Sequence, residues 1–373
     1  MRQVETIVIG GGIAGLSAAA RFAQHGEVVV LEGEDHPGYH ASGRSVAYLH
    51  FGLGDRLVRA LTAMSLEALS SDGDTLVRRH PALHIVREDE TALLDALEDS
   101  LRSFGADYER VGPERIAGIV PVLDIGEGGF REAILERSAL KLDTDAMLQA
   151  HVRALNAAGG ALECRARVER IASAGNRWQI DTSGASYSAA RVVNAAGAWA
   201  DEIADIAGVS PIGISPLRRT VIQFAAPDGV DVSPWPFVKT VGEGFYVLPE
   251  GSTRLLASPM DETPSEPCDA APEELDIAIV ADRVMQATSL DIRRIEHSWA
   301  GLRSFAPDKH PVVGYDPAAP GFFWLAGQGG FGFQTSPALA AAAEALLFGL
   351  DWPEELAALG VTVADIGPAR FAR

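Results

Sequence analysis

The stretch that decides the fold is ETIVIGGGIAGLSAAARFAQHGEVVVLEG, residues 5–33. Its β-branched opening, residues 5–9, predicts a strand that runs into a glycine turn. Residues 14–24 then have the composition of a helix, with Gly26 just past its end, and residues 27–31 predict a second strand. A strand, a helix and a second strand make a βαβ unit, so we expect an α/β fold with a parallel sheet.

The glycine turn matches a dinucleotide-binding motif. Residues 10–15, GGGIAG, follow the pattern G-x-G-x-x-G between a predicted strand and helix. Glycines there allow a backbone to approach a pyrophosphate, whose charge the helix N-terminus stabilises. Glu32 ends the second strand, 32 − 12 = 20 residues after Gly12, where a carboxylate accepts hydrogen bonds from ribose hydroxyls and disfavours a 2′-phosphate. We therefore expect FAD or NAD; the alternative is a turn that only packs helix on sheet.

The following segment favours FAD. Residues 34–45, EDHPGYHASGRS, are polar and contain glycine, where a plain NAD domain usually continues into its next helix. Such a segment can lie along a longer cofactor and offer it backbone and hydroxyl donors.

Four separated segments resemble one family. Residues 38–45 (GYHASGRS) resemble the flavin-side loop of the D-amino-acid oxidase superfamily of FAD-dependent oxidoreductases, most closely that of bacterial D-arginine dehydrogenase-like enzymes. Residues 192–199 (VVNAAGAW), 299–308 (WAGLRSFAPD) and 327–336 (GQGGFGFQTS) match in the same order. The resemblance covers nearly the whole chain. It implies a Rossmann-type FAD-binding domain with a second, substrate-binding domain on a mixed, largely antiparallel sheet.

Two interleaved domains are expected, since 373 residues suit about two domains and no long linker is present. We assign residues 1–79, 139–208 and 300–373 to the FAD-binding domain. Residues 80–138 and 209–299 then form the substrate-binding domain.

The resemblance and the motifs together imply a noncovalent FAD site. Some relatives hold the flavin through a cysteine close to the segment 299–308, and this chain has none near it. The turn at 327–335 leads into a helix whose N-terminal dipole would stabilise the anionic reduced ring. The expected cofactor-binding residues are Gly10, Gly12, Ile13, Ala14, Gly15, Glu32, Gly33, Ala41, Ser42, Gly43, Arg44, Ser45, Val168, Ala196, Gly197, Gly329, Gly330, Phe331, Gly332, Phe333, Gln334 and Thr335.

The substrate end is also expected from the resemblance. Arg219 and Arg303 occupy the positions whose arginines clamp the substrate α-carboxylate, since a guanidinium fork suits a bidentate contact. Tyr246 matches a carboxylate-side tyrosine. Gly330 would offer its carbonyl to the substrate amine, with Gln334 beside it. A surface ion pair is the alternative for either arginine, and Arg218 would face the other side of the strand.

Several positions depart from the D-arginine dehydrogenases. Tyr48 stands in place of a histidine, and Leu53 in place of an aromatic lid residue. The acid that receives the substrate guanidinium falls near Leu83 or His84, neither of which neutralises a cation; Glu88 takes that place only if the register slips. The substrate is therefore expected to be other than D-arginine.

A lysine replaces an apolar residue near the substrate side chain. Lys239, with His50, is expected to meet a substrate carboxylate, which points to a D-amino acid with a neutral or acidic side chain. The alternative is a solvent-facing strand lysine, because lysine is rarely buried.

The implied reaction is oxidative deamination. The Cα hydrogen leaves as hydride to flavin N5, and the imino acid hydrolyses to a 2-keto acid and ammonia. No catalytic base is evident. Alternatives are a secondary-amine, glycine or 2-hydroxy-acid oxidase on the same scaffold, a flavin-binding protein without turnover, and a plain NAD dehydrogenase. The electron acceptor stays open between oxygen, a quinone and an electron-transfer chain.

Composition excludes other classes. With 51 acidic and 31 basic side chains, the net charge of −20 argues against a nucleic-acid partner. Two distant cysteines, and two histidines that flank Pro81, give no metal-ligand spacing, so we expect no metal. No stretch reaches 18 apolar residues. We expect a cytoplasmic enzyme without a transmembrane segment, with contact to the inner membrane surface left open.

Overall fold

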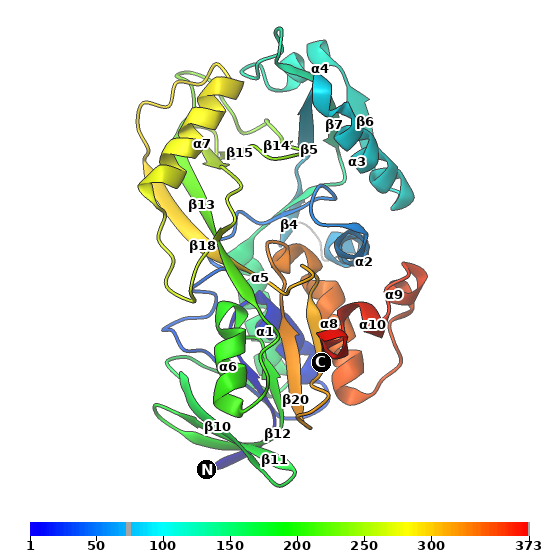
Figure 1. The fold of residues 1–373 in the computed structure, drawn as a ribbon, viewed down its shortest axis with the longest axis vertical. Helices are drawn as coiled ribbons and strands as arrows, with labels where there is room; N and C mark the ends of the chain where they lie inside the picture. Colours follow the sequence, from blue (N-terminus) through cyan, green and yellow to red (C-terminus); the bar gives the residue numbers. More distant parts are fainter. Residues whose placement is uncertain (72–75, 372–373) are drawn as a thin grey trace.

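A sheet whose central strands are parallel lies around the N-terminal strand and forms the lower half of the molecule in Figure 1, with antiparallel pairs toward its edges. The computed structural model describes residues 1–71 and 76–371. Within them this sheet has eight strands, and β1 pairs in parallel with β2 and β12, while β12 pairs in parallel with β20. The strands are β1 (Arg2–Ile9), β2 (Val28–Leu31), β9 (Ala161–Glu163), β10 (Val168–Ala174), β11 (Arg177–Thr182), β12 (Ser186–Asn194), β19 (Val312–Tyr315) and β20 (Phe322–Ala326).

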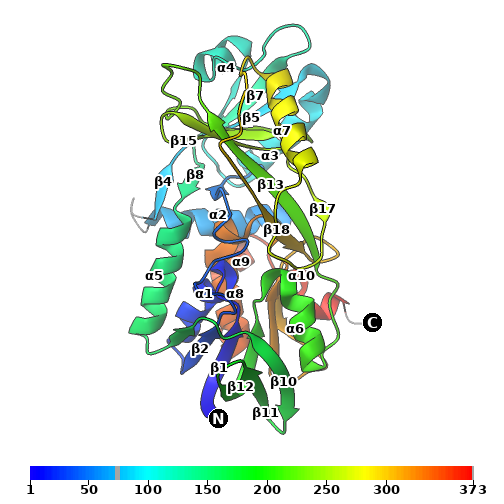
Figure 2. The same cartoon turned by 90° about the vertical axis from the view of Figure 1, so that its left-hand side faces the viewer.

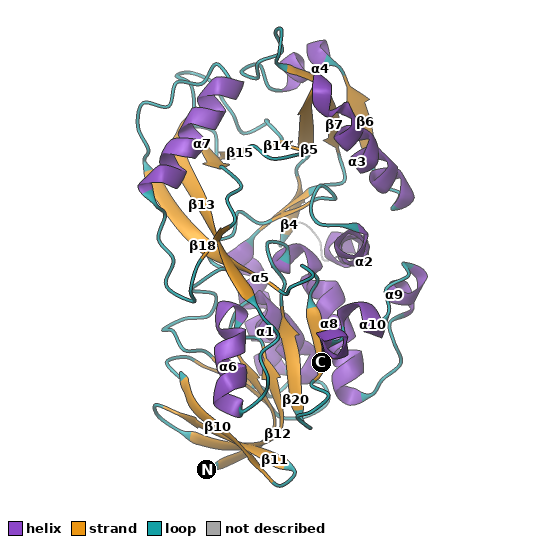
Figure 3. Cartoon of the chain, viewed as in Figure 1, coloured by secondary structure: helices purple, strands orange, loops and turns teal. Residues whose placement is uncertain are grey.

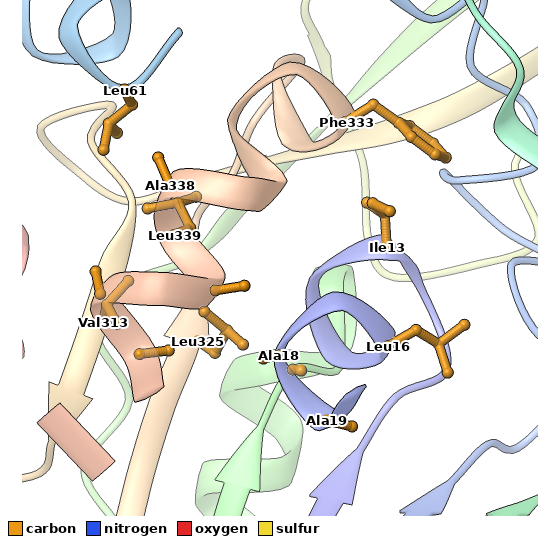
Figure 4. Close-up of a cluster of buried hydrophobic side chains, with 14 of the residues drawn as sticks. Ile13, Leu16, Ala18, Ala19, Leu61, Val313, Leu325, Phe333, Ala338 and Leu339 are labelled. Carbon is orange, nitrogen blue, oxygen red and sulfur yellow. The ribbon is translucent and has the colours of Figure 1, made fainter. Parts of the chain in front are cut away.

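Alanine-rich helices pack closely on this sheet. α1 contacts both α5 and α8, and Figure 4 shows Ala18 and Ala19 of α1 in the same buried cluster as Ala338 and Leu339 of α8. Small side chains let the helix axes approach, and the buried methyl groups stabilise the contact by about 25 cal/mol per Å² removed from water. The helices of this half are α1 (Ile13–Phe22), α2 (Arg56–Ser71), α5 (Thr144–Ala157), α6 (Ala200–Ala207), α8 (Gly332–Phe348), α9 (Glu354–Ala358) and α10 (Val363–Ile366).

The upper half is a mixed sheet. Its nine strands in the described chain run in the order β17-β13-β16-β15-β14-β5-β7-β6, with β18 paired to β13. Only the β14–β5 pair is parallel. The elements are β5 (Ala82–Arg87), β6 (Tyr108–Val111), β7 (Phe130–Glu136), β13 (Ser215–Ala225), β14 (Phe237–Thr240), β15 (Tyr246–Glu250), β16 (Arg254–Ser258), β17 (Thr263–Pro264), β18 (His297–Phe305), α3 (Thr91–Ser103), α4 (Pro113–Ile119) and α7 (Glu274–Ala287).

Two features connect the halves. The long antiparallel pair β13–β18 reaches from the upper sheet down beside β20 and α6 (Figures 1 and 2). A small sheet of β3 (Tyr48–Leu49), β8 (Leu140–Leu142) and β4 (Val77–Arg79) lies between them, close to α2 and α5 (Figure 3). The expected fold, a Rossmann-type domain with a second domain on a mixed, largely antiparallel sheet, is confirmed.

The helix and strands predicted at the start of the chain are present in the structure. The predicted helix at 14–24 corresponds to α1, and the predicted strands at 5–9 and 27–31 correspond to β1 and β2. Between β9 and β10, Arg165 adopts a left-handed conformation (φ +57°) that separates the two strands. The helix α7 was not predicted, and the expected boundary between residues 299 and 300 lies inside β18.

Candidate active site

One cavity of about 1060 Å³ extends from the β1–α1 turn to the face of the mixed sheet. Nineteen of the expected cofactor-binding residues line it; Gly15, Gly43 and Thr335 do not. Gly15 instead lies against the backbone, where a Cβ would come within 2.0 Å of the Gly10 carbonyl oxygen. Thr335 is buried and its hydroxyl donates to the Phe331 carbonyl. These three residues therefore pack behind the cavity-lining residues and do not face the cavity.

In the turn after β1, the backbone at Gly10 lies close to the backbone at Ala195. Gly10 has φ +109°, and a Cβ on it would lie 2.4 Å from the carbonyl oxygen of Ala195. The Glu32 carboxylate accepts hydrogen bonds from the backbone N–H groups of Gly11 (2.7 Å) and Glu34 (2.9 Å). These bonds hold the carboxylate at the cavity wall, where a ribose would lie.

The loop at 38–45 is fastened to this turn. The Ser42 hydroxyl accepts from the backbone N–H of Ile13 (3.0 Å), the first residue of α1. Arg44 donates to the carbonyl oxygens of Ala270 (2.7 Å) and Ala300 (3.0 Å) and forms an ion pair with Asp269. Ser42 and Arg44 thus tie the loop to α1 at one end and to β18 at the other, with the cavity beside them.

Two helix N-termini meet at the cavity. A Cβ on Gly332, where α8 begins, would lie 3.4 Å from the side chain of Ile13, and Figure 4 shows Ile13 and Phe333 at the adjoining ends of the two helices. Both ends carry unpaired N–H groups and partial positive charge. This arrangement suits a ligand with an anionic pyrophosphate and a ring that becomes anionic on reduction.

The residues present fit a flavin dinucleotide. Side chains in place of the glycines in the turn after β1 would clash with neighbouring atoms beside the cavity. The amide nitrogen of Gln328 is buried in the cavity lining and has no hydrogen-bond partner in the described chain. Gln328 was not singled out from the sequence, although it lies inside the matching segment. Cys268 lines the cavity in an exposed loop, which the chain position alone did not indicate; noncovalent attachment stays a prediction.

Arg219 and Arg303 face the cavity from neighbouring strands. Arg303 of β18 pairs with Leu217 of β13, so its side chain shares a face with Leu217 and with Arg219 two residues further on. Arg219 is buried; its Nε donates to the Asp261 carbonyl (2.7 Å), and the Asp261 and Glu262 carboxylates each lie 3.6 Å away. No carboxylate of the described residues lies within 4.0 Å of the Arg303 guanidinium.

Arg303 is therefore the less neutralised of the two. Burial, and then the charge of Arg219, lower the pKa of Arg303 to about 9. Arg218, on the opposite face, pairs with Glu273 (2.5 Å) and Asp276 (3.1 Å) and does not line the cavity. The two inward guanidinium groups leave donors free for an anion.

Gly330 lies directly against Arg303, because a Cβ on it would come within 2.3 Å of the guanidinium. Gly330→Ala is expected to displace that flexible side chain and raise KM about tenfold, the effect of losing roughly 1.4 kcal/mol of binding, while Tm stays unchanged. Steady-state kinetics check this, with Gly184→Ala as the control, since no atom lies within 4 Å of its Cβ position. An unchanged KM would contradict the contact.

Aromatic rings form the wall beyond the arginines. Phe237 of β14 lies 4.8 Å from the Tyr48 ring, 5.1 Å from the His50 ring and 5.3 Å from the Tyr246 ring. The Tyr48 hydroxyl is 2.5 Å from Nδ1 of His80. Burial raises the pKa of both Tyr48 and Tyr246, so both phenols are protonated at neutral pH. Leu53 also lines the cavity.

Lys239 is buried, and the alternative of a solvent-facing lysine is wrong. Its side chain lines the cavity at 7% exposure, opposite Tyr246 on β15, and its Nζ donates to the Thr240 carbonyl (2.8 Å). Burial lowers its pKa to about 8, with further lowering by the charges of Arg219, Arg303 and Arg59. In the described chain no carboxylate lies within 4.0 Å of this ammonium group.

His84 lies next to an acid that the sequence did not indicate. Its Nε2 is 2.9 Å from the fully buried Glu136 carboxylate, which also accepts from the Phe51 backbone N–H, and its ring lies 5.3 Å from that of His50. The three side chains have metal-ligating atoms within 4.8 Å of one another. Hydrogen bonds already engage Glu136, and Nδ1 of His50 accepts from the Gly52 N–H (3.1 Å). The absence of a metal stays a prediction.

Comparisons with known proteins show one matching family and several proteins of similar fold. The family described as FAD dependent oxidoreductase (DAO) matches residues 5–346. The bovine (Bos taurus) FAD-dependent oxidoreductase domain-containing protein 1 is 25% identical over 92% of this chain and 81% of its own length. L-proline dehydrogenase from P. horikoshii superposes with a TM-score of 0.84 at 22% identity, covering 99% of this chain and 98% of its own. Glycine oxidase from Geobacillus kaustophilus superposes with a TM-score of 0.82 at 22% identity, covering 97% and 99%.

Proposed function

Because this chain belongs to the DAO family of FAD-dependent oxidoreductases, we propose that it oxidises the C–N bond of an α-amino acid or a related amine whose carboxylate is held by Arg219 and Arg303. The observation that carries the proposal is the pair of inward guanidinium groups on one sheet face, in the same cavity as the two helix N-termini. A substrate held by its carboxylate there would present its Cα toward the cofactor end.

Bound FAD supplies the hydride-accepting chemistry. The chain itself does three things in this proposal. Glu32, Ser42 and the glycine turn hold the dinucleotide; Arg219, Arg303 and Tyr246 hold and orient the carboxylate; and Gly330 offers its carbonyl to the amine. The buried aromatic wall of Tyr48, Phe237 and Tyr246 excludes water from the reacting carbon.

The specific reaction we propose is oxidative deamination of a D-amino acid with a neutral or acidic side chain, giving a 2-keto acid and ammonia. D-Arginine is a poor fit because cations line the substrate end. A secondary-amine or glycine oxidase is the second candidate, favoured by the fold shared with L-proline dehydrogenase and glycine oxidase. A 2-hydroxy-acid oxidase and a flavin-binding protein without turnover stay as alternatives. The subgroup resemblance to D-arginine dehydrogenases also stays a prediction.

The test is anaerobic bleaching of the bound flavin. The holoenzyme is mixed with D- and L-amino acids, glycine, sarcosine, proline and 2-hydroxy acids, and the loss of flavin absorbance is followed. We expect D-amino acids to bleach it and D-arginine to be the weakest. Bleaching by sarcosine or proline alone would favour the second candidate, and no bleaching by any compound would overturn the proposal.

The electron acceptor is proposed as oxygen, a quinone or an electron-transfer chain. Among the described helices, none has the length and hydropathy needed to cross a bilayer. A cytoplasmic location stays a proposal. Reoxidation of the bleached enzyme by air, compared with a soluble quinone, distinguishes the acceptors.

A further inference from the structure

Two cations at the substrate end of the cavity form no ion pair in the described chain, although the charges of Asp55 and Glu136 act on one of them, Arg59, from further away. Lys239 and Arg59 both line it, and no carboxylate of the described chain lies within 4.0 Å of either group. The Nε atom of Arg59 is buried and has no hydrogen-bond partner in the described residues. An unpaired charge or hydrogen-bond donor inside a protein costs folding free energy. Because these two groups lie against a cavity, we expect a bound anionic ligand to supply the missing partner.

Seven acidic and seven basic side chains line the whole cavity, and four of the basic ones gather at its substrate end. These four are Arg59, Lys239, Arg219 and Arg303. Burial and then the positive charges of the three arginines lower the pKa of Lys239. Asp261 and Glu262 form ion pairs with Arg219 and with neither Lys239 nor Arg59, while a histidine and a backbone N–H already engage Glu136. A single substrate carboxylate held by Arg219 and Arg303 would leave Lys239 and Arg59 without an ion-pair partner.

The two pairs of cations lie at different places on the wall. Arg219 and Lys239 are on β13 and β14, three strand spacings apart in the sheet order, roughly 14 Å between backbones. Arg59 comes from α2, outside the sheet. Tyr246 lies opposite Lys239, between the two strands. Long side chains extending from each side leave room for a short molecule that is anionic at both ends.

We propose that Lys239 and Arg59 form a second anion site, so that the substrate is an amino or imino acid with two carboxylates. This rests on the proposed function, since the first carboxylate is the one held by Arg219 and Arg303. His50 contributes as a neutral donor: its Nδ1 accepts from the Gly52 N–H, which leaves Nε2 to carry the proton.

Matched substrate pairs test the second site. D-Glutamate and D-glutamine, and D-aspartate and D-asparagine, have nearly the same shape and differ in one charge; the L-forms, and iminodiacetate against glycine, complete the set. We expect kcat/KM of the holoenzyme to favour the acid over its amide by on the order of 10²-fold, the effect of a charged hydrogen-bonded pair worth about 3 kcal/mol. Equal values for every pair would overturn the second site and leave the proposed function standing.

Variants locate the effect. Lys239→Met and Arg59→Met are each expected to lower the acid-to-amide ratio at least tenfold, and Lys239→Arg to restore part of it. Arg254→Met is the control, because that arginine is 52% exposed and pairs with Glu296 outside the cavity. FAD content and Tm show that each variant folds. A ratio that stays unchanged in both methionine variants would overturn the proposal.

Binding without turnover gives an independent readout. Glutarate and butyrate are titrated into the oxidised holoenzyme, and the shift of the flavin absorbance spectrum is followed. We expect glutarate to bind at least tenfold more tightly, and Lys239→Met to remove the difference. Failure of all substrates to bleach the flavin would refute the proposed function, whereas equal binding of the two acids would refute the second site alone.

The ratio is also expected to depend on pH. Lys239, with a pKa of about 8 in the free enzyme, is an ammonium ion below that pH and neutral above it. The groups facing it are Arg219, Arg303, Arg59, Tyr246, His84 and His50. Burial holds the pKa of His50 well below 6.5, so it stays neutral across this range. The acid-to-amide ratio of kcat/KM should therefore fall as pH rises through about 8, and a flat ratio from pH 7 to 9.5 would contradict it.

Discussion

Arg303→Met is expected to lower kcat/KM for the best substrate by on the order of 10²- to 10³-fold, the usual consequence of removing one partner of a buried charged pair. The loss should appear mainly in KM, because the guanidinium binds the carboxylate equally before and during reaction. No protein carboxylate in the described chain lies within 4.0 Å of this group, so its removal relieves a buried charge and the folded state should be no less stable.

The control lies in the same sheet. Arg254→Met removes an exposed guanidinium that pairs with Glu296 at 2.8 Å, outside the cavity, and should change kcat/KM less than twofold. Arg303→Lys keeps the charge and loses the fork, so it should recover only part of the activity. If Arg303→Met retained kcat/KM within threefold of the wild type, the carboxylate clamp would have to be placed elsewhere.

Gly10→Ala is expected to give protein that purifies nearly free of FAD. A Cβ at this position would lie 2.4 Å from the Ala195 carbonyl oxygen, and φ is +109°, so β1, β12 and the turn cannot keep their spacing. Left-handed backbone alone costs about 1–2 kcal/mol for a residue with a Cβ; the backbone clash adds to this. We expect flavin absorbance per protein to fall at least tenfold, with a lower Tm.

Gly105→Ala is the control that separates the cost of backbone strain from the cost of the clash with Ala195. Gly105 also has a positive φ, +66°, but no atom lies within 4 Å of its Cβ position. It should lose a small amount of stability and keep its full FAD content. A Gly10→Ala protein that retained stoichiometric FAD would show that the turn does not cradle the pyrophosphate.

The nucleotide-binding half could be predicted from the sequence because its motif residues lie close together along the chain. A strand, glycines at set positions and Glu32 follow one another within 28 residues of chain, 32 − 5 + 1, so local geometry leaves few arrangements. Gly10, Gly12, Ser42 and Glu32 accordingly line the cavity. Nothing in that local pattern revealed that Ser42 bonds to the first N–H of α1, since this contact joins residues 29 apart.

The mixed sheet was harder to predict. Its strands come from distant parts of the chain, and β14 pairs with β5 across more than 150 residues, so register depends on packing and not on neighbouring residues. For that reason α7 was missed, and Glu136 was not connected with His84. Arg59 carried no motif at all and became visible only through its unpartnered nitrogen.

The sequence by itself determined the α/β class, the dinucleotide turn and an excess of 20 negative charges, which argues against a nucleic-acid partner. These follow from composition and from short-range spacing. Only the tertiary structure decided that Lys239 is buried and that Arg59, Arg219 and Arg303 surround the same cavity. A strand residue faces the core or the solvent according to the register of its sheet, and helix α2 meets that sheet only after the chain has folded. The net charge therefore says little about the substrate end of the cavity, where four cations gather.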